Sequence, residues 1–259
     1  VVRIKQAKMN NEKVTIYGDY DVDGATSVSL LYLYFQKIGI DVDYYIPDRE
    51  NEGYGLSNNG IDRIEDEDST LIITCDCGIS AIEEIEYANQ KGIDIIVTDH
   101  HTVGDNIPQA YAVINPKQKD CNYPFPYLAG VGVAFKLAEA LSQDFKIAEN
   151  YLTELLDLVA IGTAADIVDM SGENRILVAE GLKQVRDTSN YGIRELLKIT
   201  GLYDSQKISV SDIVFRISPR LNAAGRMASA SLAVNLLTTK SKVNAHQLAT
   251  HLEKLNSKR

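Results

Sequence analysis

Short runs of β-branched and aromatic residues alternate with longer amphipathic segments over the first part of the chain. Five runs have the composition of strands, at residues 14–17, 42–46, 71–74, 93–98 and 111–114. Between them, the segment SVSLLYLYFQKIG has apolar residues on one helical face and ends at Gly39, which suits a C-terminal cap, while Ser80 is placed to cap a helix that ends before Gly92. Such alternation predicts an α/β fold with a parallel sheet covered by helices.

After residue 149 the pattern changes to helical segments only, which are YLTELLDLVAIGTAADIV, NRILVAEGLKQV and YGIRELLKIT. The last stretch, from Ser231 to Arg259, has a helical pattern with a break near residues 238–241 and no terminal cap. We therefore predict an α/β core of about five strands in residues 1–149, a helical part of the same domain in 150–232, and a long connecting helix in 233–259. A helix that runs to the last residue predicts a fragment of a longer protein with a second domain.

Composition places the chain among globular proteins without a membrane span or an export signal. It has 259 residues, 45% of them hydrophobic, and no apolar run approaches the roughly 18 residues that suggest a transmembrane helix. The first residues, VVRIKQAKMN, lack the apolar stretch of a secretory signal, so we expect a cytoplasmic protein with no membrane partner. Three cysteines are too few for a disulfide framework, and the CxC pair at Cys75 and Cys77 favours buried thiols over a zinc site.

The chain is acidic, with a formal net charge of −10. This charge argues against simple electrostatic adhesion to nucleic acid, which needs clustered lysine and arginine side chains facing the phosphates. Carboxylates gathered around divalent cations would invert the local field, however. A substrate that carries phosphate is therefore expected to bind only to the metal-loaded protein.

Acidic and imidazole side chains occur in four short motifs, three of which follow predicted strands. The motifs are YGDYDVDG with Asp21 and Asp23, TCDCG with Asp76, TDHH with His100 and His101, and GTAADIVD with Asp166. The carboxyl ends of parallel strands meet at one edge of a sheet, where ligands bind, so the first three motifs should lie together. A DxDG sequence alone is more often a strand-to-helix loop with a capping aspartate, but its coincidence with the other motifs indicates a dinuclear metal site that cuts phosphoester bonds.

These motifs, in this order and at these separations, resemble those of the DHH phosphoesterase superfamily. Further stretches narrow the resemblance to its RecJ branch of single-strand-specific 5′ to 3′ DNA exonucleases; they are RENEGYGLS (49–57), INPKQ (114–118), LAGVGVAFKLA (128–138) and ISPRLNAAGRM (217–227). The resemblance covers nearly the whole chain. It implies a hydrolase that releases 5′-mononucleotides from single-stranded DNA, in DNA repair and recombination, with two divalent metal ions as cofactors.

The resemblance also implies which residues serve the two ions. Asp21 and Asp76 would hold one ion, and Asp23, Asp76, His100 and Asp166 would hold the other, with Asp76 as the bridge. Oxygen and imidazole ligands without thiolate suit Mn²⁺ or Mg²⁺, and the imidazole favours Mn²⁺. The implied catalytic residues are Asp23, Asp76 and His101, and His101 would contact the scissile phosphate or protonate the leaving oxygen.

One position departs from the family pattern. Many members of the superfamily have a histidine four residues before the first aspartate of DxD, and this chain has Tyr17 there. Asp19, two residues before Asp21, or a water molecule is expected to complete the first metal site in its place.

Substrate contacts follow from the same resemblance. Arg220 and Arg226 flank LNAAG, where small residues let the backbone approach closely and the guanidinium groups can hold phosphate oxygens. By resemblance, Arg220 and Asn222 lie near the scissile phosphate and Arg49 lies near the 5′-terminal phosphate. Tyr54 in EGYGLS can offer a platform for base stacking, with packing under the loop as the alternative.

Other functions of the superfamily remain alternatives. A phosphodiesterase acting on short oligoribonucleotides or cyclic dinucleotides, or a pyrophosphatase, would use the same ligands, whereas the intact ligand set opposes a non-catalytic nucleotide-binding module. Single-stranded DNA is the expected partner, a helicase and a single-strand binding protein are candidate protein partners, and the sequence indicates no oligomeric state. No GGHxxAAG-like motif occurs before Arg259, so we expect weak or non-processive cleavage, because half of the DNA clamp would be absent.

Overall fold

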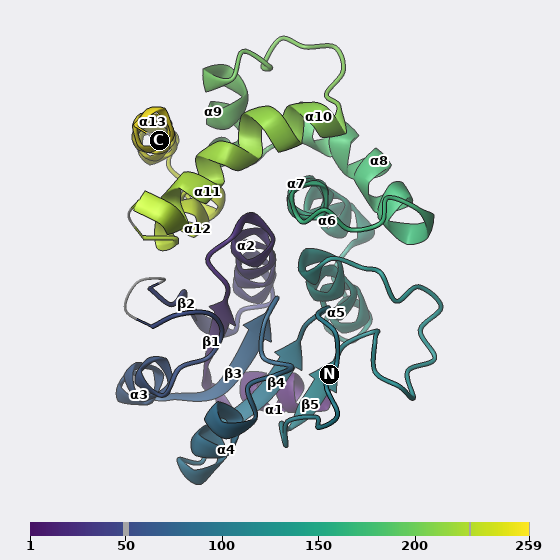
Figure 1. The fold of residues 1–259 in the computed structure, drawn as a ribbon, viewed down its shortest axis with the longest axis vertical. Coiled ribbons are helices and arrows are strands. Elements are labelled where there is room, and N and C mark those ends of the chain that lie inside the picture. The colour runs from purple at the N-terminus through teal and green to yellow at the C-terminus, as the bar shows by residue number, and fades with distance from the viewer. Residues whose placement is uncertain (49–51, 228, 259) are drawn as a thin grey trace.

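Five parallel strands form the central sheet of the structure, a computed structural model that describes residues 1–48, 52–227 and 229–258. The strands are β1 (Lys13–Gly18), β2 (Asp41–Tyr45), β3 (Ser69–Cys75), β4 (Asp94–Thr98) and β5 (Ala112–Ile114). Their order in the sheet is β2-β1-β3-β4-β5, and every neighbouring pair is parallel (Figure 1). The prediction of an α/β fold built on a parallel sheet is confirmed.

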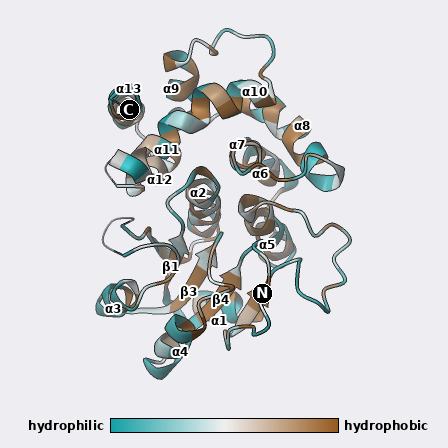
Figure 2. Cartoon of the chain, viewed as in Figure 1, coloured by the Kyte–Doolittle hydropathy of each residue, from teal (hydrophilic) through white to brown (hydrophobic). Residues whose placement is uncertain are grey.

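Helices cover both faces of the sheet. The helices α1 (Val2–Asn10), α2 (Val22–Lys37) and α5 (Gly130–Phe145) lie on one face, and α3 (Asn58–Asp66) and α4 (Ile82–Gln90) lie on the other (Figure 1). Side chains of β3 alternate between the two faces, since Leu71 and Ile73 belong to the larger core cluster and Ile72 belongs to the smaller one. A strand buried on both faces is hydrophobic along its length, as Figure 2 shows for the central strands.

The second half of the chain is helical, as predicted. Its helices are α6 (Glu149–Glu154), α7 (Leu156–Ala165), α8 (Gly172–Arg186), α9 (Tyr191–Ile199), α10 (Val210–Asp212), α11 (Ser218–Met227), α12 (Ser231–Thr238) and α13 (Lys242–Ser257), with a π-helical turn at Ile213–Ile217 between α10 and α11. The break expected near residues 238–241 lies between α12 and α13, while the expected boundary at residue 233 falls inside α12. α13 packs against α9 and α11, and its Ala249 and Leu252 are fully buried. Among the described residues, no helix is both long and apolar enough to cross a membrane.

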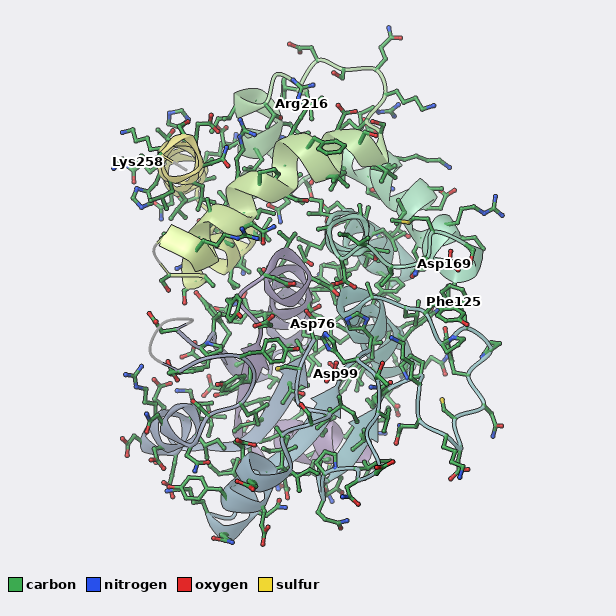
Figure 3. The ribbon with its side chains drawn as sticks, viewed as in Figure 1. Asp76, Asp99, Phe125, Asp169, Arg216 and Lys258 are labelled. Atoms are coloured by element: carbon green, nitrogen blue, oxygen red, sulfur yellow. The ribbon has the colours of Figure 1, made fainter. Side chains whose placement is uncertain are left out.

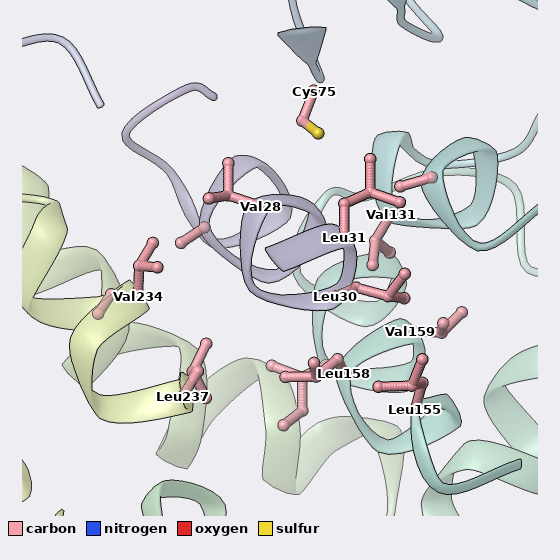
Figure 4. Close-up of a cluster of buried hydrophobic side chains, with 14 of the residues drawn as sticks. Val28, Leu30, Leu31, Cys75, Val131, Leu155, Leu158, Val159, Val234 and Leu237 are labelled. Carbon is pink, nitrogen blue, oxygen red and sulfur yellow. The ribbon is translucent and has the colours of Figure 1, made fainter. Parts of the chain in front are cut away.

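One core joins the sheet to the helical half, and α2 lies at its centre. Most residues of α2 are buried, which is typical of a helix enclosed on all sides. Figure 4 shows Val28 and Leu30 of α2 among side chains of the surrounding helices, including Val131 of α5, Leu158 of α7 and Val234 of α12. The two halves are therefore packed together around α2. In particular, α7 packs against α2, whose N-terminal end carries the first predicted metal motif.

The predicted helix ends are confirmed at one position and wrong at another. Gly39, with a φ of 70°, follows the last residues of α2 in the left-handed conformation expected of a C-terminal cap. Ser80 does not cap α4, because the amide of Ala81 donates to the Gly78 carbonyl and closes a turn first. Ala81 is the residue that precedes α4, and no side chain caps this helix.

Candidate metal centre

The predicted ligands follow the central strands, at the place in the sheet where successive connections change direction. β1 lies between β2 and β3, so the connections that leave β1 and β3 run to opposite sides of the sheet. Asp21 and Asp23 follow β1, Asp76 follows β3 and His100 follows β4. In an open parallel sheet, this reversal leaves a crevice at the carboxyl ends of the strands in which ligands bind. Figure 3 labels Asp76 and Asp99 at this end of the sheet.

Asp21 has the capping role that its motif suggests when taken alone, together with a place in the site. Its Oδ1 accepts a hydrogen bond of 2.8 Å from the amide of Gly24 and thereby caps α2. Gly24 is required for a close approach, because a Cβ there would lie 2.5 Å from the carbonyl oxygen of Asp19. The tight turn therefore places Asp19, Asp21 and Asp23 around one end of α2.

Asp23 is held by the beginning of α5. Its Oδ2 accepts from the amide of Gly130 at 2.6 Å, and its Oδ1 accepts from the amide of Val131 at 2.9 Å. The first amides of a helix have no partner within the helix and carry partial positive charge, so they stabilise a buried carboxylate. Gly130 also packs against the next ligand, since a Cβ at this position would lie 2.7 Å from Oδ1 of Asp76.

Asp76 turns sharply out of β3. Its φ of 60° is left-handed, a conformation that aspartate adopts more readily than most other residues with a side chain. The amide of Asp76 donates to the carbonyl of Thr98 at 3.0 Å, which ties the turn to the end of β4. The side chain of Asp76 is thereby fixed between the motifs that follow β1 and β4.

Asp166 arrives from the helical half of the chain, at the C-terminal end of α7. Small residues allow this approach, because a Cβ on Gly162 would lie 2.2 Å from Oγ1 of Thr26 and 3.0 Å from Oδ1 of Asp23. Close packing of α7 on α2 and α5 therefore carries the fourth motif to the edge of the sheet.

His100 lies among three carboxylates. Its Nε2 is 3.0 Å from Oδ1 of Asp76, 3.6 Å from Oδ2 of Asp166 and 3.9 Å from Oδ2 of Asp23. Within the described part of the chain, Nε2 of His100, Oδ1 of Asp76 and Oδ2 of Asp166 are buried atoms without a hydrogen-bond partner. Buried polar atoms are nearly always satisfied, and oxygen and imidazole donors that face one point fit a divalent cation.

The structure assembles the predicted ligands into three overlapping groups, each with its ligand atoms within 4.8 Å of one another. The groups are Asp19 with Asp21 and Asp76, Asp23 with His100 and Asp166, and Asp76 with His100 and His101. Asp76 belongs to two of these three groups, and His100 belongs to two as well.

Tyr17 has no part in these groups. Its side chain is buried on the face of the sheet that α3 and α4 cover. There the hydroxyl donates to the carbonyl of Gly55 at 3.0 Å, and the centre of the ring lies 5.2 Å from that of Tyr45. Asp19 lies beside Asp21 and Asp76 instead. Asp19 is therefore placed near the first site, whereas Tyr17 is not.

Burial and mutual repulsion shift the protonation of the ligands. Burial, followed by the nearby charges of Asp166 and Asp21, raises the pKa of Asp23, and burial with the charge of Asp23 raises that of Asp76. Burial and the charge of Asp21 raise the pKa of Asp166 to about 6. Burial and neighbouring His101 lower the pKa of His100 to about 4, so its imidazole is neutral and able to ligate a metal at neutral pH.

These shifts predict a pH-dependent response to metal. Carboxyl groups whose pKa is raised by folding bind more protons in the folded state, so their contribution to stability falls as pH rises from about 4 through 6 and beyond. A bound cation removes this repulsion, and protons compete with it. We expect added Mn²⁺ to raise the melting temperature more at pH 8 than at pH 5, as measured by differential scanning fluorimetry.

The difference between metal-loaded and EDTA-treated protein isolates the site from other titrating groups. Buried Asp157, whose pKa burial raises to about 6, lies outside the groups of ligands and contributes equally to both samples. In metal-free protein, the lowered pKa of His100 has the opposite effect on stability to the raised pKa values of the carboxylates. The folded state binds the proton of His100 more weakly than the unfolded state does, so this contribution to stability rises with pH. An equal effect of Mn²⁺ at the two pH values would contradict the predicted coupling.

His101 lies beside His100, with its Nδ1 3.9 Å from Oδ1 of Asp76. It is held by Asp99, to which the sequence motifs assigned no role. Asp99 Oδ1 lies 2.7 Å from Nδ1 of His101 and accepts the amides of His100 and His101, while Oδ2 accepts the amide of Ile79. Burial works to raise the pKa of Asp99, but these hydrogen bonds outweigh it and lower the pKa. The ionised Asp99 therefore accepts from Nδ1, which raises the pKa of His101 and leaves Nε2 for other contacts. The signal for Asp99 in the sequence was its position directly before the two histidines.

Asp99 is expected to act as a positioning residue. In Asp99→Asn, an amide oxygen in the place of Oδ1 can still accept from Nδ1 and from the amides of His100 and His101. The carboxylate charge that stabilises a protonated His101 is lost, however, and the amide nitrogen faces the donor amide of Ile79. We expect kcat to fall roughly 10- to 100-fold, the range found for residues that orient a ligand or base, with little change in the Mn²⁺ midpoint. A parallel loss of metal affinity and kcat would instead indicate collapse of the loop.

The predicted substrate residues occupy different places. Tyr54 lies at the centre, with its ring 6.0 Å from that of His101 and its hydroxyl 3.3 Å from the Asp76 carbonyl. Arg226 and Tyr20 line a hollow of about 800 Å³ that adjoins the first motif. Arg220 lies in α11, and its Nε is 2.5 Å from Oε2 of Glu253. Asn222, also in α11, is half-buried, and Arg49 lies outside the described residues.

Comparison with known proteins identifies the family. The family model described as "DHH family, N-terminal domain" matches residues 13–163. The chain belongs to the DHH family. It is 45% identical over 257 residues to the single-stranded-DNA-specific exonuclease RecJ of Bacillus subtilis (strain 168), an alignment that covers 99% of this chain and 32% of that protein. The predicted resemblance to the DHH superfamily and to its RecJ branch is confirmed.

Solved DHH-family structures have the same architecture. The crystal structure of an exonuclease RecJ bound to manganese aligns with a TM-score of 0.89 at 35% identity, over 99% of this chain and 64% of that one. RecJ from Thermus thermophilus in complex with Mn²⁺ aligns with a TM-score of 0.84 at 32% identity, over 99% of this chain and 37% of that one. The chain thus spans about a third of the length of the Bacillus subtilis relative, and the similarity concerns that part.

Proposed function

We propose that this chain is the catalytic core of a two-metal exonuclease that hydrolyses single-stranded DNA from its 5′ end to 5′-mononucleotides, in DNA repair and recombination. The observation that carries the proposal is the convergence of Asp76, His100 and Asp166, whose buried ligand atoms have no hydrogen-bond partner in the described residues. Such a constellation in a chain so similar to single-stranded-DNA-specific exonucleases supports phosphodiester hydrolysis.

The described residues would hold two divalent cations. Asp19, Asp21 and Asp76 would hold one, and Asp23, Asp76, His100 and Asp166 would hold the other. Oxygen ligands with one imidazole suit Mn²⁺ best and Mg²⁺ as well, in keeping with similar structures bound to manganese. When bound, two such ions lower the pKa of water and neutralise charge on the phosphate.

The chain's own residues would orient the substrate and supply the proton. His101, held by Asp99 through Nδ1, would present Nε2 to the phosphate or to the leaving oxygen. Tyr54 is half-exposed beside His101, where its ring can stack on a base. The hollow lined by Tyr20 and Arg226 would accept the strand next to the centre, with the guanidinium facing a phosphate.

Arg220 would need a change of partner to bind phosphate. Its guanidinium contacts Glu253 of α13, and a phosphate would have to replace that carboxylate. The roles proposed for Arg49, Arg220 and Asn222 as phosphate contacts therefore rest on the family resemblance and not on their contacts in this structure.

The length of the preferred substrate tests the proposed function. With Mn²⁺, we expect degradation of a 5′-phosphorylated single strand in preference to the same strand in a duplex, to di- and trinucleotides, and to cyclic dinucleotides. Products are resolved by gel electrophoresis and chromatography, with EDTA as the control. Preference for dinucleotides or cyclic dinucleotides would contradict the proposal and favour the alternative phosphodiesterase.

Three further expectations belong to the same proposal. Residues 233–259 would lead to a second domain, so we expect the isolated chain to cleave weakly and non-processively, which a trap of excess unlabelled DNA would detect. We also expect a cytoplasmic location. A helicase and a single-strand binding protein are the expected partners, because they produce and hold the unpaired DNA that such an enzyme needs.

A further inference from the structure

Ile167, the residue after Asp166, has an unfavourable backbone conformation and an exposed side chain. Its φ is 58°, in the left-handed region, where the Cβ of an L-residue crowds the following carbonyl oxygen. A β-branched residue in this region is an outlier. The side chain of Ile167 is 94% exposed, so its packing in this structure does not offset the unfavourable conformation.

The local structure explains the turn but not the side chain. The amide of Asp166 donates to the carbonyl of Gly162 as α7 ends, and the next residue turns left-handed, a position that usually carries glycine or asparagine. Ala165, two residues before Ile167, and Val168, the residue after it, are partly buried and pack against the main core. Ile167 is the sole β-branched residue with a positive φ in the described part of the chain.

The position of Ile167 places it beside the proposed metal centre. Oδ2 of Asp166 is 3.6 Å from Nε2 of His100, and the Cα atoms of consecutive residues are about 3.8 Å apart. A phosphodiester held at this centre must extend its sugars and bases away from the ligands, because both of its ester oxygens carry a nucleoside. Strained residues of this kind persist where binding or catalysis uses them.

We propose that Ile167 is a substrate-binding residue whose side chain packs against the sugar or base of the nucleotide held at the metal centre. This inference rests on the proposed function. The contact removes aliphatic surface from water only when the strand is bound, and it is independent of sequence because every nucleotide offers an apolar face. The left-handed backbone aims the side chain outward, where glycine would offer no contact.

The conformation allows a test in which folding and function respond in opposite directions. Ile167→Gly removes both the steric conflict and the side chain, so we expect an unchanged or higher melting temperature and an unchanged Mn²⁺ midpoint. The KM for a 5′-phosphorylated single strand should rise roughly fivefold or more, since loss of a partly buried aliphatic contact has this size. Ile167→Leu, which keeps apolar bulk, should restore most of the affinity.

Two controls separate the contact from other causes. Ile176→Ala removes exposed apolar surface from α8, where Ile176 is 59% exposed, and should leave KM within twofold. Ile167→Asn tolerates the left-handed backbone without an apolar side chain and should match the glycine variant. If Ile167→Asn has the wild-type KM, then the raised KM of Ile167→Gly comes from its more flexible backbone and not from the lost side chain. That result would overturn the inference.

The inference and the proposed function fail in distinguishable ways. An active wild-type chain with unchanged KM in Ile167→Gly contradicts the role of Ile167 alone, and would indicate that its exposed side chain serves another contact. A wild-type chain that binds Mn²⁺ but does not degrade single-stranded DNA contradicts the proposed function and the inference together.

Discussion

A chain in which Asp76 is replaced by asparagine is expected to fold normally and to lose metal-dependent DNA cleavage by a factor on the order of 10³ or more. Asp76 belongs to two of the three ligand groups and lies 3.0 Å from His100, so its carboxylate is the one placed to bridge two ions. Asparagine has nearly the same shape and tolerates the φ of 60° at this position. Loss of one buried charge also reduces repulsion with Asp23.

The measurements for Asp76→Asn separate chemistry from folding. We expect its melting temperature in EDTA to equal or exceed that of the wild type, and the stabilisation by Mn²⁺ to be largely lost. Asp157→Asn is the matched control, because Asp157 is also a buried carboxylate but bonds to Thr188 and to the amide of Leu158 outside the centre. Retained cleavage by Asp76→Asn would overturn the bridging role.

Replacement of Gly130 by alanine is expected to damage the metal centre although the residue carries no ligand atom. A Cβ at this position would lie 2.7 Å from both Cβ and Oδ1 of Asp76. The Asp76 side chain has little room to move because its backbone is fixed by the turn after β3 and its carboxylate by the neighbouring ligands. The amide of Gly130 also binds Asp23, so a shift would disturb two ligands.

We expect Gly130→Ala to lower Mn²⁺ affinity about 10- to 100-fold and to lower stability by about 1–3 kcal/mol, as overpacking does. Gly132→Ala is the control from the same helix, since its Cβ would meet the flexible side chain of Leu128 at 3.2 Å. Alanine favours a helix by about 1 kcal/mol over glycine, so this variant should be neutral or stabilised. Equal effects of the two substitutions in metal titration and thermal melting would show that the contact with Asp76 is not critical.

Much of the sheet was predictable because its signals are local. The β-branched runs near Val14, Leu71 and Ile95 are strands buried on both faces, where apolar composition and strand length coincide. Ser80 was predicted as a cap and is not one, because the turn at Gly78 delays the start of α4 by a hydrogen bond that composition does not reveal. Helix boundaries depend on such single contacts, whereas whole elements depend on many residues.

The candidate site was predictable in its residue types and less so in its partners. Neither the replacement of the expected histidine by Tyr17 nor the presence of Asp19 shows which side chain reaches the centre. Tyr17 alternates to the opposite face of β1, where it packs with Tyr45, and Asp19 follows the strand into the turn. The role of Asp99 depends on the position of His101 in space, and the pairing of Arg220 with Glu253 joins residues far apart in the chain.

By itself the sequence determined the order of strands and helices, the candidate ligand residues and the edge of the sheet at which three motifs end, because periodicity and strand polarity are properties of short segments. Tertiary structure decided which atoms meet. Asp166 reaches His100 only because α7 packs closely on α2 at Gly162, and Asp23 is fixed only because α5 begins beside it. Contacts between distant segments depend on how a whole core packs, and no local pattern records that.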